Sequence, residues 1–309
     1  MRVVFMGNGA FGVPSLRSLA HSAHQVLAVV TNPDKPAGRH QVPTPTPIKQ
    51  EALKLGLPIW EVASPKEPAL PERLQALKAD IFVVVAYPII PRRVRTIPPL
   101  GAINIHPSLL PAYRGPAPIP WSIICGDTVT GVTIFRIGDQ VDAGDILLQR
   151  AYPLPEDWDA GQLERFLAEV SADLLLEVLE GLALGTIQPV PQPQGKEVSY
   201  APKLSSENTR IVWHKTAHEV YNFVRGLSPQ PRAWTIFQGK RLQILKAEKM
   251  PARRTMHPPG TIWQEGGQLL VACGDAPLRL VEVHLEGKKP VSGAEFVQGY
   301  VKNAILHLD

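Results

Sequence analysis

The first 150 residues alternate short, almost wholly apolar runs with segments whose apolar residues recur at helical spacing. The runs Arg2–Met6, Val26–Val30 and Ile81–Ala86 lack the polar alternation of a half-exposed strand, whereas Pro14–His21 has the spacing of a helix. Strands that are apolar on both sides are typical of a parallel sheet with helices on both faces. The sequence therefore predicts an α/β fold with a Rossmann-like, mostly parallel sheet.

The pattern changes after residue 150. A long helix is predicted over 161–181, and it is followed by Ile187–Gln194, which is too rich in proline and glutamine to form a regular element. Beyond residue 206 the apolar runs are short, β-like and nearly evenly spaced, which favours a small barrel or a sandwich, and we expect a β-barrel of the OB type. We therefore expect an α/β catalytic domain over 1–186, a semi-rigid linker over 187–205 and a C-terminal barrel over 206–309.

The charge is distributed unevenly along the chain. Residues 1–205 contain 18 lysines and arginines against 19 acidic residues, whereas residues 206–309 contain 14 against 9, so the net charges are −1 and +5. A basic domain favours a polyanionic partner such as nucleic acid, and a merely solvated basic surface is the alternative. The tryptophans of this domain are expected in its core rather than as stacking platforms; they are Trp213, Trp234 and Trp263. The basic residues considered for nucleic-acid contact are Lys240, Arg241, Lys246, Lys249, Arg253 and Arg254.

Composition disfavours several other classes of protein. No apolar run approaches the roughly 20 residues that cross a bilayer, and the apolar stretch at the N-terminus is too short for a signal peptide. Cys125 and Cys273 alone cannot form a disulfide framework or a four-cysteine zinc site. We therefore expect a cytoplasmic protein without a membrane partner, and we expect it to be a monomer.

A glycine-rich turn follows the first predicted strand. Gly7–Gly12 fits the pattern G-x-G-x-x-G between a strand and a helix, which is the context of a dinucleotide-binding fingerprint. The fingerprint also needs an acidic residue at the end of the second strand, but Asp34 comes only after Pro33, inside the following loop. We favour a structural turn, and an NAD-dependent oxidoreductase is the alternative.

An asparagine and a histidine lie close together in the segment Gly101–Gly115. Asn104 and His106 alternate with isoleucines, so both side chains project from one face of a strand, near the end where open α/β sheets bind ligands. Downstream, the loop Asp139–Asp145 supplies carboxylates without a second histidine or cysteine group that would indicate a metal site. An amide, an imidazole and a carboxylate suit attack by an amine on a carbonyl group.

The segment Asn104–Gly115, with Gly131–Thr133 and Asp142–Asp145, resembles the formyltransferases that use 10-formyltetrahydrofolate. The resemblance implies that Asn104 binds the formyl oxygen, that a protonated His106 stabilises the tetrahedral oxyanion, and that Asp142 polarises His106 and relays the proton of the amine. It implies the folate as co-substrate, with no metal and no nicotinamide. The residues implied for folate contact are Ser108, Leu109, Leu110 and Pro111.

Two further segments are similar to the methionyl-tRNA formyltransferase branch of that family. Asn32–Lys49 resembles an insertion loop that approaches the tRNA acceptor stem, and Tyr200–Leu204 followed by a basic β domain resembles that branch as well. The resemblance implies transfer of the formyl group to the α-amino group of initiator Met-tRNA, with release of tetrahydrofolate. A sugar-nucleotide amine N-formyltransferase is the alternative within the family. The residues implied for tRNA contact are Lys35, Arg39 and Lys49.

Overall fold

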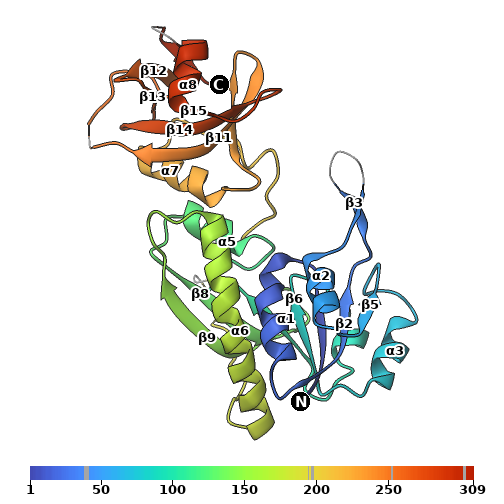
Figure 1. Ribbon diagram of the computed structural model, residues 1–309. Coiled ribbons are helices and arrows are strands. Elements are labelled where there is room, and N and C mark those ends of the chain that lie inside the picture. Colours follow the sequence, from blue (N-terminus) through green and yellow to red (C-terminus); the bar gives the residue numbers. More distant parts are fainter. Residues whose placement is uncertain (38–41, 194, 196–197, 252, 302–303) are drawn as a thin grey trace. The chain divides into compact units, whose positions relative to one another are not determined.

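The chain forms two compact units (Figure 1). The computed structural model describes residues 1–37, 42–193, 195, 198–251, 253–301 and 304–309. Unit 2 takes two short segments from the N-terminal part of the chain, so the units interleave along the sequence. The boundaries expected at 186 and 205 stay a prediction. Unit 1 comprises Met1–Pro118, Thr130–Tyr152 and Glu164–Tyr200, and unit 2 comprises Ile119–Val129, Pro153–Leu163 and Ala201–Asp309.

A mostly parallel sheet of seven strands forms the centre of unit 1. Its strands are β1 (Arg2–Gly7), β2 (Gln25–Thr31), β5 (Ile59–Glu61), β6 (Ile81–Val85), β7 (Ala102–His106), β8 (Val129–Arg136) and β9 (Ile146–Pro153). Their order is β5-β2-β1-β6-β7-β8-β9. The pairs from β5 to β7 are parallel, and β7 pairs antiparallel with β8. This topology confirms the predicted α/β class with a Rossmann-like sheet.

Helices cover both faces of this sheet. Val4 and Met6 of β1 share a core with Leu70 and Leu74, and the alternate positions of β1, which point to the opposite face, are buried as well. The helices are α1 (Val13–Ala20) after the 3₁₀ turn η1 (Ala10–Gly12), α2 (Pro47–Lys54), α3 (Leu70–Ala76), α4 (Arg92–Arg95) and α6 (Ala160–Leu184). The first two lie side by side and pack against β2 (Figure 1). Among the described residues, no helix is long and apolar enough to cross a membrane.

A small hairpin interrupts the connection between β2 and α2, which the sequence predicted to be a loop. Strands β3 (Lys35–Ala37) and β4 (Val42–Thr44) pair antiparallel, with Pro36 opposite Pro43. Proline lacks the N–H that a central strand needs, but it is tolerated here because both strands of a two-stranded ribbon are edges. Arg39 lies outside the described residues.

Unit 2 contains an antiparallel sheet that closes almost completely on itself. Its strands are β10 (Ala233–Phe237), β11 (Lys240–Lys249), β12 (Thr261–Glu265), β13 (Gln268–Ala272), β14 (Pro277–Leu285), β15 (Val291–Ser292) and β16 (Leu306–His307). The order is β10-β11-β14-β13-β12-β16, with β15 beside β14. Beyond β16, Asp309 exchanges backbone hydrogen bonds of 3.2 and 3.0 Å with Ile236 of β10, which joins the two edges. The predicted C-terminal barrel is therefore confirmed.

The helices of unit 2 are α5 (Pro118–Ile124), α7 (Ala217–Gly226) and α8 (Gly293–Phe296), which continues into the π-helical turn η2 (Val297–Val301). Thr216 and Glu219 form a capping box at the start of α7. Trp213 is buried in the barrel core, as predicted, and its indole donates to Thr235. The prediction is wrong for Trp234 and Trp263, which are half-buried outside that core: the Arg241 guanidinium stacks on the Trp234 ring, and the Trp263 indole donates to Glu265.

Candidate active site

The candidate catalytic histidine is the last residue of β7. His106 lies opposite Thr133 of β8, and Asn104 lies opposite Phe135. Residues two apart along a strand project to the same face, so Asn104 and His106 share one face of the sheet, as the sequence predicted. His106 is buried, with 4% of its surface exposed, whereas Asn104 is half-buried.

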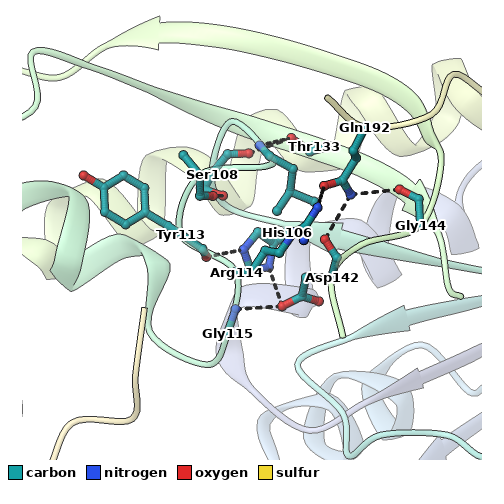
Figure 2. A network of polar contacts seen from close by, with 11 residues as sticks. His106, Ser108, Tyr113, Arg114, Gly115, Thr133, Asp142, Gly144 and Gln192 are labelled. Carbon is teal, nitrogen blue, oxygen red and sulfur yellow. Dashed lines mark hydrogen bonds and ion pairs between the residues drawn. The ribbon is translucent and has the colours of Figure 1, made fainter. Parts of the chain in front are cut away.

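Each ring nitrogen of His106 faces a fixed partner (Figure 2). Nε2 lies 2.9 Å from the Tyr113 carbonyl oxygen, and Nδ1 lies 3.8 Å from Oδ2 of Asp142. Because a carbonyl oxygen only accepts, Nε2 carries the hydrogen, and Nδ1 of the neutral ring has a lone pair on the side of Asp142. Burial lowers the pKa of His106, and the Asp142 carboxylate and the Tyr113 carbonyl oppose that shift without cancelling it. This direction favours a neutral ring in the free protein near pH 7, and the imidazolium that the resemblance implies for the reaction stays a prediction.

Asp142 is held in the loop between β8 and β9. Its Oδ2 accepts a hydrogen bond of 2.8 Å from the Gly115 amide, which fixes the carboxylate beside the histidine (Figure 2). Its φ of +51° is a left-handed conformation that costs a residue with a side chain about 1–2 kcal/mol. A Cβ on Gly144 would lie 1.7 Å from the Arg136 carbonyl oxygen, so only glycine allows the loop to fold this tightly.

The acidic residues of this loop do not gather into a metal-binding cluster. Asp139 pairs with Arg95, Asp142 faces His106, and Asp145 is exposed. Within the described ranges, no group of three or more histidine, cysteine, aspartate or glutamate side chains is placed to hold a metal ion.

Buried and partly buried hydrogen bonds fix the segment that was expected to contact the folate. The Thr133 hydroxyl donates to the Ser108 carbonyl oxygen over 2.7 Å and accepts from the Leu110 amide over 3.1 Å. The Gln149 carboxamide donates to the Leu110 carbonyl oxygen over 2.8 Å. The Ser108 hydroxyl donates to the Ala112 carbonyl oxygen over 2.7 Å, so it serves the turn itself. Thr133 belongs to the motif Gly131–Thr133 that the family resemblance includes. Gln149 could not be predicted from the sequence, because a single polar residue on a strand forms no pattern.

No role was predicted for two side chains beside the His106–Asp142 pair, those of Gln192 and Arg114. Gln192 donates to the carbonyl oxygens of Asp142 and Gly144 over 2.9 and 2.8 Å, and it accepts from Nη2 of Arg114 over 2.7 Å (Figure 2). It is buried, with 8% of its surface exposed. It comes from the proline- and glutamine-rich segment that the sequence predicted to be a linker, where one glutamine does not stand out.

Comparisons with known proteins show the family of this chain. Residues 1–179 match the family model described as Formyl transferase, and residues 203–301 match that of the Formyl transferase C-terminal domain. A methionyl-tRNA formyltransferase of Roseiflexus castenholzii is 44% identical to this chain, over 97% of the chain and 96% of its own length. Further curated relatives with the same description are 40–42% identical. The chain belongs to the methionyl-tRNA formyltransferase family.

Solved structures share the fold of this formyltransferase at low identity. HypX from Aquifex aeolicus in complex with tetrahydrofolic acid aligns with a TM-score of 0.66 and 20% identity, over 98% of this chain and 48% of its own. This chain therefore spans about half the length of HypX. An N-formyltransferase from Helicobacter canadensis, in complex with folinic acid and dTDP-3-aminofucose, aligns with a TM-score of 0.68 and 18% identity, over 90% and 98% of the two chains. At these identities the likeness supports the fold alone.

The glycine-rich turn of this formyltransferase packs tightly against neighbouring residues. A Cβ on Gly7 would lie 3.0 Å from the Val85 carbonyl oxygen, and one on Gly12 would lie 3.2 Å from the side chains of Val85 and Ile48. Close packing therefore accounts for both glycines, as the structural interpretation of this turn predicted.

Asn8, inside the same turn, holds the base of the segment Asn32–Lys49. Its Oδ1 accepts from the Thr31 hydroxyl over 3.0 Å and from the Asn32 amide over 2.8 Å, and its Nδ2 donates to Oδ1 of Asn32 over 2.8 Å. The Thr31 and Thr46 hydroxyls are 2.6 Å apart, and Thr46 caps α2 by accepting from the Lys49 amide. Both ends of the segment are thus tied to one polar network, in which Thr31 is fully buried.

The residues expected to contact tRNA differ in their surroundings. The Lys49 ammonium lies 2.7 Å from Asp34 and 2.9 Å from Glu61, so its charge is already compensated. Lys35 is exposed on the hairpin. Arg39 lies outside the described residues, so its placement stays a prediction.

Proposed function

We propose that this enzyme transfers the formyl group of 10-formyltetrahydrofolate to the α-amino group of initiator Met-tRNA and releases tetrahydrofolate. The observation that carries the proposal is the buried His106–Asp142 pair, with Asn104 on the same strand face, inside the segment that matches the formyltransferase family. The formyl carbon keeps its oxidation state, so the transfer needs no nicotinamide, and the proton transfers below need no metal. Because charged tRNA is used where ribosomes work, the proposal implies a cytoplasmic enzyme.

In the proposed reaction the neutral amine attacks the formyl carbon, and the carbonyl electrons move to oxygen. The Asn104 carboxamide donates a hydrogen bond to this developing oxyanion. Nδ1 of His106, which has a lone pair in the neutral ring, accepts the proton that the attacking nitrogen loses. The imidazolium so formed lies 3.8 Å from Asp142, whose negative charge stabilises it. When the bond to N10 of the folate breaks, the imidazolium returns its proton to N10.

For the folate, we propose contacts with the segment from Ser108 to Pro111. Thr133 and Gln149 hold this segment in one conformation, which lowers the entropic cost of binding. The Ser108 and Leu110 side chains are buried within the protein, so contact falls to backbone groups and to the half-buried Leu109.

For the tRNA, we propose that Lys35 and Arg39 contact the acceptor stem. We propose that Lys49 acts instead by holding the loop, because its ammonium already pairs with Asp34 and Glu61. In unit 2, Lys249 pairs with Glu156, Arg253 pairs with Glu265, and Arg241 stacks on Trp234. The exposed cations considered for phosphate contact are therefore Lys240, Lys246 and Arg254.

Formyl transfer from labelled 10-formyltetrahydrofolate tests the proposed function directly. Label should appear in Met-tRNA. The enzyme should not formylate a dTDP-amino sugar or oxidise NADH at a comparable rate. Label in the amino sugar alone would establish the sugar-nucleotide alternative. Turnover of NADH without any formyl transfer would establish the oxidoreductase.

Arg39→Ala tests the tRNA assignment within this reaction. We expect a higher KM for Met-tRNA, an unchanged Kd for tetrahydrofolate, and a salt dependence of tRNA binding whose slope falls by about one, as for a lost phosphate contact. Lys66→Ala, which removes an exposed charge outside the loop, is the matched control. Native kinetics of Arg39→Ala on Met-tRNA would assign the loop to another task.

A further inference from the structure

Val190, Gln192 and Ser199 contact the two stretches of chain that hold the partners of the His106 ring, one around Asp142 and one around Tyr113. Val190 exchanges backbone hydrogen bonds of 2.7 and 2.8 Å with Ile146, the first residue of β9. These bonds fix the position of the chain two residues before Gln192. A spacer between domains would not need such pairing.

Gln192 uses every polar group of its carboxamide. Both hydrogens go to carbonyl oxygens of the loop that carries the carboxylate, those of Asp142 and Gly144, and the oxygen accepts from Arg114. The orientation of the amide is unambiguous, because two carbonyl oxygens can only accept and a guanidinium can only donate. Gln192 therefore fixes the backbone of Asp142 itself, at a residue whose left-handed φ needs support.

The far end of the same segment fixes the other side of the pair. The Ser199 hydroxyl accepts from the Tyr113 amide over 2.9 Å, and the Ser199 carbonyl oxygen accepts from the Arg114 amide over 2.9 Å. The Tyr113 carbonyl oxygen is the partner of Nε2 of His106. The side chain of Arg114 then reaches back to Gln192, so the contacts form a continuous chain from one partner of His106 to the other (Figure 2).

We propose that Gln192 is a positioning residue that holds the Asp142 carboxylate at its working distance from His106. It contacts no reacting atom in this assignment and acts through the backbone of Asp142. The inference rests on the proposed function, since it assumes that the His106–Asp142 pair moves the proton of the attacking amine.

Gln192→Ala and Gln192→Glu test the assignment from two sides. Alanine removes both donors and leaves the Arg114 guanidinium without its partner, whereas glutamate keeps the size and an acceptor for Arg114 but cannot donate to the carbonyl oxygens. We expect kcat to fall on the order of 10–100-fold in both, as for a misplaced catalytic group, while both KM values stay within about twofold. Gln188→Ala is the matched control, because Gln188 is an exposed glutamine four residues before Gln192, and this variant should keep native kcat.

A double-mutant cycle with Asp142→Asn separates positioning from general stability. If Gln192 acts through the Asp142 charge, Gln192→Glu should change single-turnover rates less than about twofold in the Asp142→Asn background. An equal fold-loss in both backgrounds overturns the inference, and so does native kcat in Gln192→Glu with an unchanged melting temperature. Formylation of Met-tRNA by the wild-type enzyme is measured first. Its absence refutes the proposed function, whereas the cycle refutes only the role of Gln192.

Discussion

Replacing Asp142 by asparagine removes the negative charge beside His106 and keeps both the size of the side chain and an oxygen for the Gly115 amide. The attraction between an imidazolium and a carboxylate 3.8 Å apart is about 4 kcal/mol at an effective dielectric constant near 20. Since about 1.4 kcal/mol corresponds to a tenfold change in rate, losing this attraction in the transition state should lower kcat on the order of 10³-fold.

The assay is steady-state transfer of labelled formyl groups to Met-tRNA over a range of pH, with tetrahydrofolate binding followed by calorimetry. The Kd should not change, because Asp142 acts on the imidazolium rather than on the bound folate. The carboxylate raises the pKa of His106, so its loss lowers that pKa further. The neutral ring is the active base in the proposed mechanism, so the acid limb of kcat should move to lower pH in Asp142→Asn.

Asp145→Asn is the matched control, because its side chain is exposed in the same loop. It should retain near-native turnover. Near-native turnover in Asp142→Asn, with inactivation of Asp145→Asn, would refute the assignment of the carboxylate. A rate that falls as the pH rises through the titration of His106 would refute the neutral base and restore the protonated histidine expected from the sequence.

Three further predictions follow from the structure. The free energy of unfolding should fall as the pH drops below about 6.5, because His106 then becomes protonated in the unfolded chain but not in the native protein, where its pKa is lowered. In urea titrations, His106→Asn should make the free energy of unfolding less dependent on pH in this range. Gly144→Ala forces a Cβ to 1.7 Å from a backbone oxygen, so turnover should fall on the order of 10²-fold, and thermal melting should show a free energy of unfolding lower by about 1–3 kcal/mol. Gly138→Ala should be tolerated, because the atom nearest to its Cβ would lie 3.7 Å away. Asn8→Ala leaves the base of the 32–49 segment without its polar anchor, so the KM for Met-tRNA should rise more than the Kd for tetrahydrofolate; equal changes in both would show that Asn8 only stabilises the fold.

Much of the fold could be predicted because its signals are local. The apolar runs that become β1, β2 and β6, and the periodic helices α1 and α6, depend on patterns within 5 to 25 residues. The pairing of β3 with β4 was missed because the prolines of both strands are typical of a loop. Only the structure assigns Ile119–Val129 and Pro153–Leu163 to unit 2, since no local pattern says which distant core a segment joins.

The sequence by itself determined the α/β class, the C-terminal barrel, the family and the three candidate catalytic side chains, whose roles stay a prediction. These follow from periodicity and from a long motif, both of which are written along the chain. Only the tertiary structure decided which nitrogen of His106 faces Asp142, and that burial lowers the pKa of the ring. It also decided that Gln192, 50 residues beyond Asp142, holds that residue's backbone. Protonation and positioning depend on burial and on hydrogen-bond partners, and folding brings those partners together from positions whose separation carries no pattern.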